Sequence, residues 1–265
     1  MAKRAKRATR SNPREDRNFS REEKFQRNDR AYKTRGDNVV SVNFASPAKK
    51  KNVEIIPRSL NQETLVASLE DNNKHIVFAV GPAGCGKTLL ATLAAIKALK
   101  EGSIEKIVVS RPNIAVDDKD IGFLPGDIMQ KMAPWMAPIF DVFAEYYSQK
   151  EILGMVEEKV IEVVPVAYIR GRTFKNAYVL FDEAQNSTPT SMLSVLTRIG
   201  ENSKLIITGD VRQGDRGLNN GLSDVIRRMA SHDPVHIDLV EFEERDVERH
   251  PVIKEVLKMY KDLKI

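Results

Sequence analysis

Residues 81–88 read GPAGCGKT, and their neighbours give this short segment its meaning. The apolar run HIVFAV at 75–80 precedes it and is suited to a buried strand. Residues 89–100 follow it, are rich in Ala, Leu and Lys, and predict a helix. The pattern G-x-x-x-x-G-K-S/T between a strand and a helix is typical of a phosphate-binding loop.

The loop predicts a site for a nucleoside triphosphate. Backbone N–H groups of a glycine loop, together with the positive end of the following helix dipole, favour bound phosphate. We expect Lys87 to reach the β- and γ-phosphates and the Thr88 hydroxyl to ligate Mg²⁺. The predicted ligands are therefore ATP and Mg²⁺. The predicted nucleotide contacts in this segment are Gly81, Pro82, Ala83, Gly84, Cys85, Gly86, Lys87, Thr88 and Leu89.

Length and composition favour one large domain in the cytoplasm. The chain has 265 residues, 42% of them hydrophobic, which suffices for a single α/β core. No apolar run is long enough to span a membrane, and the N-terminus lacks the apolar core of a secretory signal. Cys85 is the one cysteine, so no internal disulfide is expected. We expect a cytoplasmic protein without a membrane partner.

The positive charge is concentrated in an N-terminal tail. Residues 1–51 contain 16 Lys and Arg against 6 Asp and Glu, whereas the rest of the chain carries a net charge of −5. The tail is poor in large apolar side chains, so we predict that it is largely disordered. Two roles remain open: binding of nucleic acid through its phosphates, or a solubilising tail without a defined partner. We assign 1–51 to the tail and 52–265 to the folded domain.

Apolar strands and helices alternate through the domain. This alternation predicts a parallel sheet with helices on both faces. The strands are expected at 75–80, 105–110, 160–164, 177–181, 204–208 and 235–240. The helices are expected at about 59–70, 89–100, 127–150 with interruptions at Pro134 and Pro138, 188–199, 221–229 and 251–263, with a further helical turn or two at 151–158.

An acidic pair follows the apolar strand at 177–181. A carboxylate at the carboxyl end of a central parallel strand, beside a phosphate loop, suits Mg²⁺ binding by Asp182. Glu183 is placed to polarise the attacking water as a general base. We expect Gln185, which follows closely, to sense the γ-phosphate. Asn186 is equally well explained as a turn residue.

Further polar residues are expected to face the nucleotide. Thr208, Asp210 and Gln213 follow the strand at 204–208, and ligands of doubly wound sheets bind beyond the carboxyl ends of strands. Gln62 has two competing explanations. It stands three residues after Ser59, as in a helix capping box, or its amide reads the adenine base.

An arginine is expected to neutralise charge at the γ-phosphate. The candidates are Arg170, Arg172, Arg245 and Arg249, of which Arg249 is preferred and Arg172 comes second. Trp135, the one tryptophan, is explained better by core packing than by stacking on a base.

These motifs together resemble the PhoH-like ATPases, including phage members, and related superfamily 1 helicase cores. The resemblance covers most of residues 55–265, and the acidic-pair and TGD segments are its most specific parts. Two features depart from it: Cys85 stands where the family usually has Thr, and the nuclease-like PIN domain of some relatives is absent, so no nuclease activity is expected. The matching segments are GPAGCGKT (81–88), SRPN (110–113), GFLPGDI (122–128), YIRGRTFKNAYVLFDEAQNSTPTSM (168–192), LTRIGENSKLIITGDVRQGD (196–215) and DVERHP (246–251).

The resemblance implies a RecA-like P-loop ATPase that depends on Mg²⁺ and acts on nucleic acid, with RNA favoured over DNA. It also implies RNA unwinding and a ring-shaped homo-oligomer, a hexamer, in which an arginine completes the neighbouring subunit's site.

Three functions compete at this point. The first is a nucleic-acid-dependent ATPase, such as an RNA helicase. The second is a P-loop kinase for a small molecule, against which Glu183 argues because kinases avoid activating water. The third is a nucleotide-gated RNA-binding or scaffold protein that hydrolyses ATP slowly.

Overall fold

The computed structural model describes residues 52–112, 136–213 and 219–249, together with 252, 255 and 259. All of them belong to one compact unit. The predicted tail at 1–51, Trp135 and most of the predicted final helix at 251–263 lie outside the described residues. Within the described part of the chain, no helix has the length and apolar character needed to cross a membrane.

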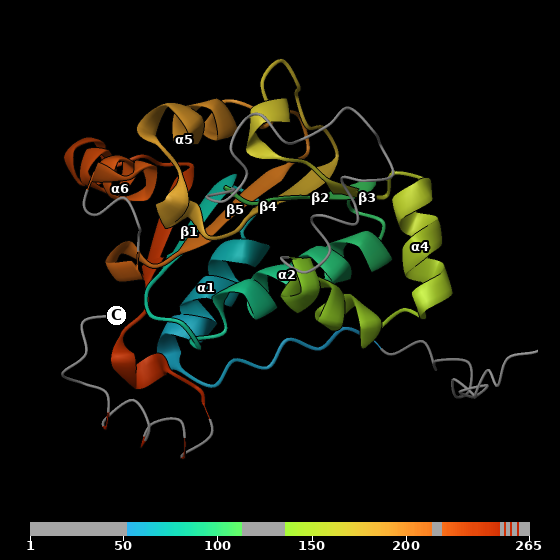
Figure 1. Cartoon of the computed structure of the whole chain (residues 1–265), viewed down its shortest axis with the longest axis horizontal. Helices are drawn as coiled ribbons and strands as arrows, with labels where there is room; N and C mark the ends of the chain where they lie inside the picture. The colour runs from blue at the N-terminus through green and yellow to red at the C-terminus, as the bar shows by residue number, and fades with distance from the viewer. Residues whose placement is uncertain are drawn as a thin grey trace, which may run out of the picture. The chain divides into compact units, whose positions relative to one another are not determined.

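Six parallel strands form a single sheet in the order β3-β2-β4-β5-β1-β6 (Figure 1). The central strands are almost entirely buried, which explains their continuous apolar sequence. The strands are β1 (Ile76–Val80), β2 (Lys106–Ser110), β3 (Ile161–Val163), β4 (Ala177–Phe181), β5 (Lys204–Gly209) and β6 (Ile237–Glu241).

Helices cover both faces of this sheet. In Figure 1, α5 and α6 lie above the sheet and α1 and α2 lie below it. The helices are α1 (Leu60–Glu70), α2 (Lys87–Lys100), α4 (Gln149–Glu157), α5 (Pro189–Leu196) and α6 (Gly221–His232), with a further helical segment at 136–144. Short 3₁₀ turns occur at η2 (Val166–Tyr168), η3 (Ala184–Asn186), η4 (Val211–Gln213) and η6 (Glu244–Asp246).

The alternation of side chains along each strand produces two hydrophobic cores. On β1, Val77 packs into the core between the sheet and helices α1 and α2. Its neighbour Phe78 packs into the core between the sheet and helices α5 and α6. Ile206 and Ile207 on β5 divide between the two cores in the same way. The structure therefore confirms the predicted α/β class, a parallel sheet with helices on both faces.

The largest difference from the predicted boundaries concerns the interrupted helix expected at 127–150, of which residues 127–135 lie outside the described residues. The rest is divided: a helical segment covers 136–144, and α4 begins separately after Ser148, close to the further helical turn expected at 151–158. Ser148 and Glu151 form a reciprocal capping box, in which each side chain bonds the other residue's backbone N–H. This cap satisfies N–H groups that a continuous helix would have bonded internally, so it stabilises a new helix start.

The strand order determines where the site is built. β5 lies between β1 and β4, so the strand before the phosphate loop and the strand before the acidic pair are separated by one strand. Because all six strands are parallel, their carboxyl ends meet at one edge of the sheet. The phosphate loop, the acidic pair and the end of β5 therefore converge at that edge.

Candidate nucleotide site

The phosphate loop depends on glycines at two tight places. Gly81 has φ +145°, and a Cβ there would lie 2.4 Å from the backbone oxygen of Phe242. Gly86 has φ +79°, in the left-handed region, and forms the N-cap of α2. Side chains are strained in this conformation, so the loop can pass close to its neighbours only with glycine. Helix α2 begins directly after this loop, and the first backbone N–H groups of a helix favour a bound phosphate.

Lys87 is held inside the loop. Its side-chain Nζ donates to the carbonyl oxygens of Gly81 at 2.7 Å and of Pro82 at 2.6 Å. The residue is buried, and this burial lowers the pKa of its ammonium below the ordinary value, while nearby carboxylates oppose the shift. The loop therefore concentrates a positive charge where phosphate oxygens are predicted to lie.

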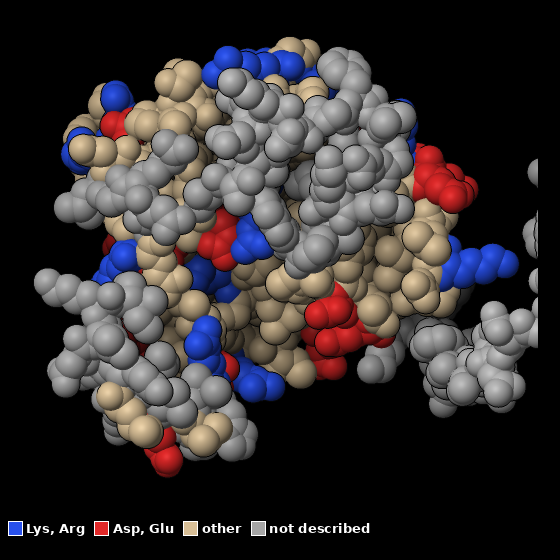
Figure 2. All heavy atoms as spheres, viewed as in Figure 1, with Lys and Arg blue, Asp and Glu red and all other residues tan. Residues whose placement is uncertain are grey.

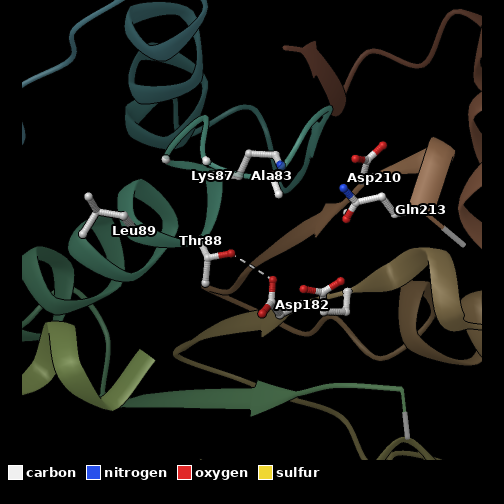
Figure 3. Close-up of a pocket in the computed structure, with 11 residues that line it drawn as sticks. Ala83, Lys87, Thr88, Leu89, Asp182, Asp210 and Gln213 are labelled. Carbon is white, nitrogen blue, oxygen red and sulfur yellow. Dashed lines mark hydrogen bonds between the residues drawn. The ribbon is translucent and has the colours of Figure 1, made fainter. Parts of the chain in front are cut away.

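Asp182 accepts hydrogen bonds from two hydroxyl groups. Thr88 Oγ1, at the start of α2, donates to Asp182 Oδ1 at 3.0 Å, as Figure 3 shows. Thr208 Oγ1, near the end of β5, donates to the same carboxylate oxygen. Asp182 is largely buried, so these donors replace the hydrogen bonds to water that its carboxylate loses on burial. A hydroxyl and a carboxylate oxygen at this separation form the hard, all-oxygen donor set that Mg²⁺ prefers.

Glu183 lies beside this pair in an unusual backbone conformation. Its φ is +55° and its ψ is +41°, in the left-handed region that non-glycine residues seldom occupy. One carboxylate oxygen, Oε1, accepts from Arg111 Nη2 at 2.8 Å, and the other accepts from Gln185 Nε2. These two hydrogen bonds hold the Glu183 carboxylate in place at the end of β4.

Gln185 connects the ends of two strands. Its Nε2 donates to Glu183, and its Oε1 accepts from the backbone N–H of Asp210 at 3.1 Å. The residue is almost completely buried, so both ends of the amide are satisfied within the protein. A shift of the Glu183 carboxylate would therefore be transmitted to the segment after β5. This geometry suits the sensing role predicted for Gln185.

An open cavity of about 280 Å³ lies between these groups. Figure 3 shows Lys87 and Thr88 reaching it from the loop side, with Asp182, Asp210 and Gln213 on the opposite side. Gly81 and Pro82 line instead a neighbouring cavity next to β6, which Asp210 shares with the first cavity. The residues that line the first cavity are Ala83, Gly84, Gly86, Lys87, Thr88, Leu89, Asp182, Glu183, Gly209, Asp210 and Gln213.

Most of the chain matches one protein-family model. Residues 54–261 match the family model described as PhoH-like protein. The chain belongs to the PhoH-like protein family. This result confirms the resemblance seen in the motifs.

Curated relatives match the chain over most of its length. It is 40% identical over 215 residues to the PhoH-like protein of Bacillus subtilis (strain 168), covering 80% of this chain and 65% of that relative. It is 40% identical over 192 residues to Protein PhoH of Escherichia coli (strain K12), covering 71% of this chain and 53% of that one. The chain therefore spans less than two thirds of the length of these relatives.

Solved structures resemble the chain more distantly. A Sulfolobus solfataricus SWI2/SNF2 ATPase core in complex with dsDNA is 14% identical, with a TM-score of 0.42 over 81% of this chain and 53% of that one. The DnaC helicase loader is 12% identical, with a TM-score of 0.34 over 72% of this chain and 96% of that one. Because both scores lie below 0.5, we draw no conclusion about activity from them.

Gln62 binds the backbone of the phosphate loop of this PhoH-like domain. Its Nε2 donates to the Cys85 backbone oxygen at 3.1 Å, and its Oε1 accepts from the Arg58 backbone N–H at 2.7 Å. Ser59 caps α1 by accepting from the Gln62 backbone N–H at 3.4 Å. The cap is therefore present, but the Gln62 amide holds the loop instead of completing a capping box. Because both ends of the amide are engaged with backbone, this conformation leaves little of it for an adenine base.

The two preferred arginines lie in different places. Arg172 pairs with Glu162 at 2.6 Å and packs its guanidinium 4.8 Å from the ring centroid of Phe174. It does not line the cavity of its own chain, so its predicted position beside the γ-phosphate is not observed. The Arg249 side chain packs against the phosphate loop of its own chain. A Cβ added to Gly84 in that loop would lie 2.4 Å from Arg249 Nε.

The other two candidates are exposed on the surface. Arg245 pairs with Glu243 at 3.1 Å, and Arg170 is exposed.

The sequence analysis missed Arg111 as a site residue. It follows β2 directly, and β2 is the hydrogen-bonded neighbour of β4. Its guanidinium lies 2.8 Å from Glu183 and 3.8 Å from the second carboxylate oxygen of Asp182. The available signal was its position in the SRPN segment, at the carboxyl end of a predicted parallel strand.

Cys85, which stands where the family usually has Thr, is fully buried in the loop. Burial raises the pKa of its thiol above the ordinary value, although the nearby Lys87 opposes the shift. A helix dipole beside a thiol favours the thiolate, but at Cys85 desolvation of the thiolate is the larger effect. The position of Cys85 supports a steric role instead.

Proposed function

We propose that this chain hydrolyses ATP in a Mg²⁺-dependent reaction and that bound nucleic acid, RNA rather than DNA, controls the rate. The observation that carries the proposal is the position of the Glu183 carboxylate. It lies next to the Thr88–Asp182 pair and lines the same cavity as Lys87. A carboxylate in that position can polarise a water molecule for attack on a phosphoryl group.

Each predicted residue has a distinct role in this reaction. Lys87 would bind the β- and γ-phosphate oxygens, and Thr88 and Asp182 would hold Mg²⁺, which supplies charge neutralisation at those oxygens. Glu183 would accept a proton from water as the water oxygen bonds to the γ-phosphorus. The bond from that phosphorus to the bridging oxygen breaks, and ADP leaves with the electron pair.

The geometry favours hydrolysis over phosphate transfer to a small molecule. A kinase must keep water away from the γ-phosphate, whereas Glu183 is held at the cavity by Arg111 and Gln185. The cavity is also open to solvent, so it offers no enclosed acceptor site. Both features support water as the acceptor.

The proposal for nucleic acid rests on charge and family resemblance. The net charge of the tail, with 16 basic and 6 acidic residues in 1–51, suits attraction to a phosphate backbone. In the described part of the face seen in Figure 2, Lys and Arg are instead scattered among Asp and Glu. We therefore propose that the tail contributes most of the non-specific affinity. Unwinding and a homo-hexameric ring are further proposals from the resemblance, and they retain Arg249 and Arg172 as candidates for an arginine acting on a neighbouring subunit.

One assay tests the function. ATP hydrolysis by the full chain is measured with Mg²⁺, alone and with single-stranded RNA or DNA of equal length, next to the Lys87→Ala variant. We expect RNA to stimulate hydrolysis and Lys87→Ala to abolish it. Undiminished turnover in Lys87→Ala would rule the proposal out. Phosphate transfer to an added acceptor supports the kinase alternative, and ATP binding with negligible turnover supports a scaffold.

The proposed ring has its own test. The solution mass measured with ATP and Mg²⁺ should correspond to six chains, and a monomer at working concentrations contradicts this assembly.

A further inference from the structure

Asp246 is a buried carboxylate that no step of the proposed reaction uses. It ends the short turn η6 after β6 and is only 3% exposed. Its Oδ2 accepts from the Asn61 side-chain Nδ2 at 2.7 Å and from the Glu243 backbone N–H at 2.8 Å. Burial acts to raise the pKa of Asp246, but hydrogen bonds from Glu243, Asn61 and Ser59 hold it below the ordinary value. The ionised carboxylate therefore joins two segments that are 185 residues apart in the chain.

The first of these segments is the start of α1. Asn61 lies in the first turn of this helix, and the next residue, Gln62, donates to the Cys85 backbone oxygen in the phosphate loop. The first backbone N–H groups of a helix have no partner within the helix and favour a negative charge nearby. Asp246 therefore stabilises the end of α1 that carries the contact to the loop.

The second segment, residues 243–248, contacts the phosphate loop itself. The backbone N–H of Glu248 donates to the Gly84 backbone oxygen at 3.0 Å. The Cys85 thiol lies 3.8 Å from the Glu243 backbone oxygen, as a weak donor. In Figure 1 the chain after β6 lies beside the start of α1. We call residues 59–62 and 243–248 together the clasp, because both segments bind the loop and the carboxylate of Asp246 binds them to each other.

The clasp affects the affinity for nucleotide through the conformational freedom of the loop. Glycine-rich backbone has many accessible conformations, so a loop that is already fixed loses less entropy when a ligand binds. If the clasp opens, only the fraction of molecules with a correctly shaped loop can bind, and the apparent Kd rises by the inverse of that fraction. Bound phosphates then hold the loop themselves, so the rate at saturating ATP should depend little on the clasp.

We propose that Asp246 is a positioning residue that fixes the phosphate loop in the shape that binds nucleotide. It does not line the cavity, and it acts through Gln62 on one side and Glu248 on the other. This inference rests on the proposed function, because it requires that ATP binds in the loop. It adds that the affinity for ATP depends on the segment after β6.

The test compares two variants of the full chain by the Kd of a fluorescent ATP analogue and by the kinetics of hydrolysis. Asn61→Ala removes one hydrogen bond to Asp246. Ser203→Ala is the control at the opposite edge of the sheet, where the Ser203 hydroxyl donates to the Phe174 backbone oxygen at 2.9 Å and accepts from the Ala177 backbone N–H at 3.1 Å.

The two variants should differ in the affinity for ATP and not only in stability. We expect Asn61→Ala to raise the Kd and the KM for ATP by about tenfold, or about 1.4 kcal/mol, which one hydrogen bond to a charged group can supply. Its kcat should stay at the wild-type value. Ser203→Ala should lower the Tm but leave both the Kd and the KM unchanged.

An exchange of the two partners separates the role of the contact from that of either side chain. Asn61→Asp alone places two carboxylates side by side and should raise the Kd further. Addition of Asp246→Asn restores a donor and an acceptor in reversed order, because an amide oxygen can accept from the Glu243 N–H while the amide nitrogen donates. The Kd of the double variant should return towards the wild-type value.

Hydrogen exchange reports on the loop contact directly. The Glu248 backbone N–H, which is bonded to Gly84, should exchange faster in Asn61→Ala than in the wild type. Saturating ATP should slow this exchange again, because the bound phosphates hold the loop.

Several results would overturn the role of Asp246. One is a wild-type Kd in Asn61→Ala, or a rise in Kd that Ser203→Ala matches. Another is a fall in kcat at an unchanged Kd, which would place the effect in the chemical step. A double variant that binds as weakly as Asn61→Asp also counts against the contact. If Asn61→Ala does not fold, Asp246→Asn decides by the same measurement of Kd, because it keeps an acceptor for Glu243 and loses the charge.

These outcomes are separate from those of the proposed function. A wild-type chain that binds no nucleotide contradicts the nucleotide site itself. A wild-type chain that binds ATP through Lys87, with an Asn61→Ala variant that binds it equally well, contradicts only the role of Asp246.

Discussion

Replacement of Thr208 by valine should weaken the fold and the metal site together. The substitution removes one hydroxyl and keeps the branched shape, so no cavity forms in the 3% exposed position. The lost interaction is the hydrogen bond from Thr208 Oγ1 to the ionised, buried Asp182. Such bonds contribute about 1.5–3 kcal/mol. We therefore expect the free energy of unfolding to fall by about 2 kcal/mol, or the Tm by about 4–8 °C for a domain of this size.

The assay for Thr208→Val combines urea unfolding with a Mg²⁺ titration of ATP hydrolysis. Asp182 loses one of its two hydroxyl donors, so the Mg²⁺ concentration for half-maximal rate should rise. Thr92→Val is the matched control, because Thr92 is equally buried and donates at 2.6 Å to a neutral acceptor, the Thr88 carbonyl. Its loss should cost about 1 kcal/mol and leave the Mg²⁺ titration unchanged. Equal effects of both variants, or none for Thr208→Val, would refute the reasoning.

Three further outcomes follow from individual groups. Glu183→Gln should keep ATP binding, measured with a fluorescent nucleotide, but lower kcat by about 10²–10⁴-fold through loss of the general base; near-normal turnover contradicts that role. Burial lowers the pKa of Lys204 from 10.5 to about 8, so between these values the unfolded chain binds more protons and stability rises with pH. In urea unfolding, the free energy of unfolding of the wild type should therefore rise relative to that of Lys204→Met between pH 8 and 10.5, but not below pH 8. A relative fall of the wild type over the same range refutes the lowered pKa. Cys85 should react slowly with a maleimide at pH 7.5 in the folded chain and rapidly in urea, and rapid reaction in both states is incompatible with its burial.

The parts of the site that lie close together in the chain were predictable. The glycine pattern and the lysine and threonine of 81–88 are contiguous, and the backbone conformation that they require is local. The buried strands were predictable because each is an apolar run with its own boundaries. The division of the helix at 127–150 was also visible in principle, because Ser148 and Glu151 have the spacing of a capping box.

The partners of the acidic pair were not predictable from the same signals. Arg111 precedes Glu183 by 72 residues, and Thr208 follows Asp182 by 26. Whether they meet depends on the order of β2, β4 and β5 in the sheet, which is a property of packing across the whole domain. Arg172 shows the same limit, because its segment passes close to Glu162 and forms an ion pair there instead of reaching the phosphate loop.

The amino-acid sequence alone determined that a phosphate loop would form, because glycine freedom and an apolar strand act within a few residues. It also determined the chemistry available at the acidic pair. Only the tertiary structure decided that β5 separates β1 from β4, and that Arg111 and Gln185 both hold Glu183. The physical reason is the separation along the chain over which each interaction acts. Backbone conformation and helix caps depend on neighbouring residues, whereas ion pairs between strand ends depend on the order of the strands in the whole sheet.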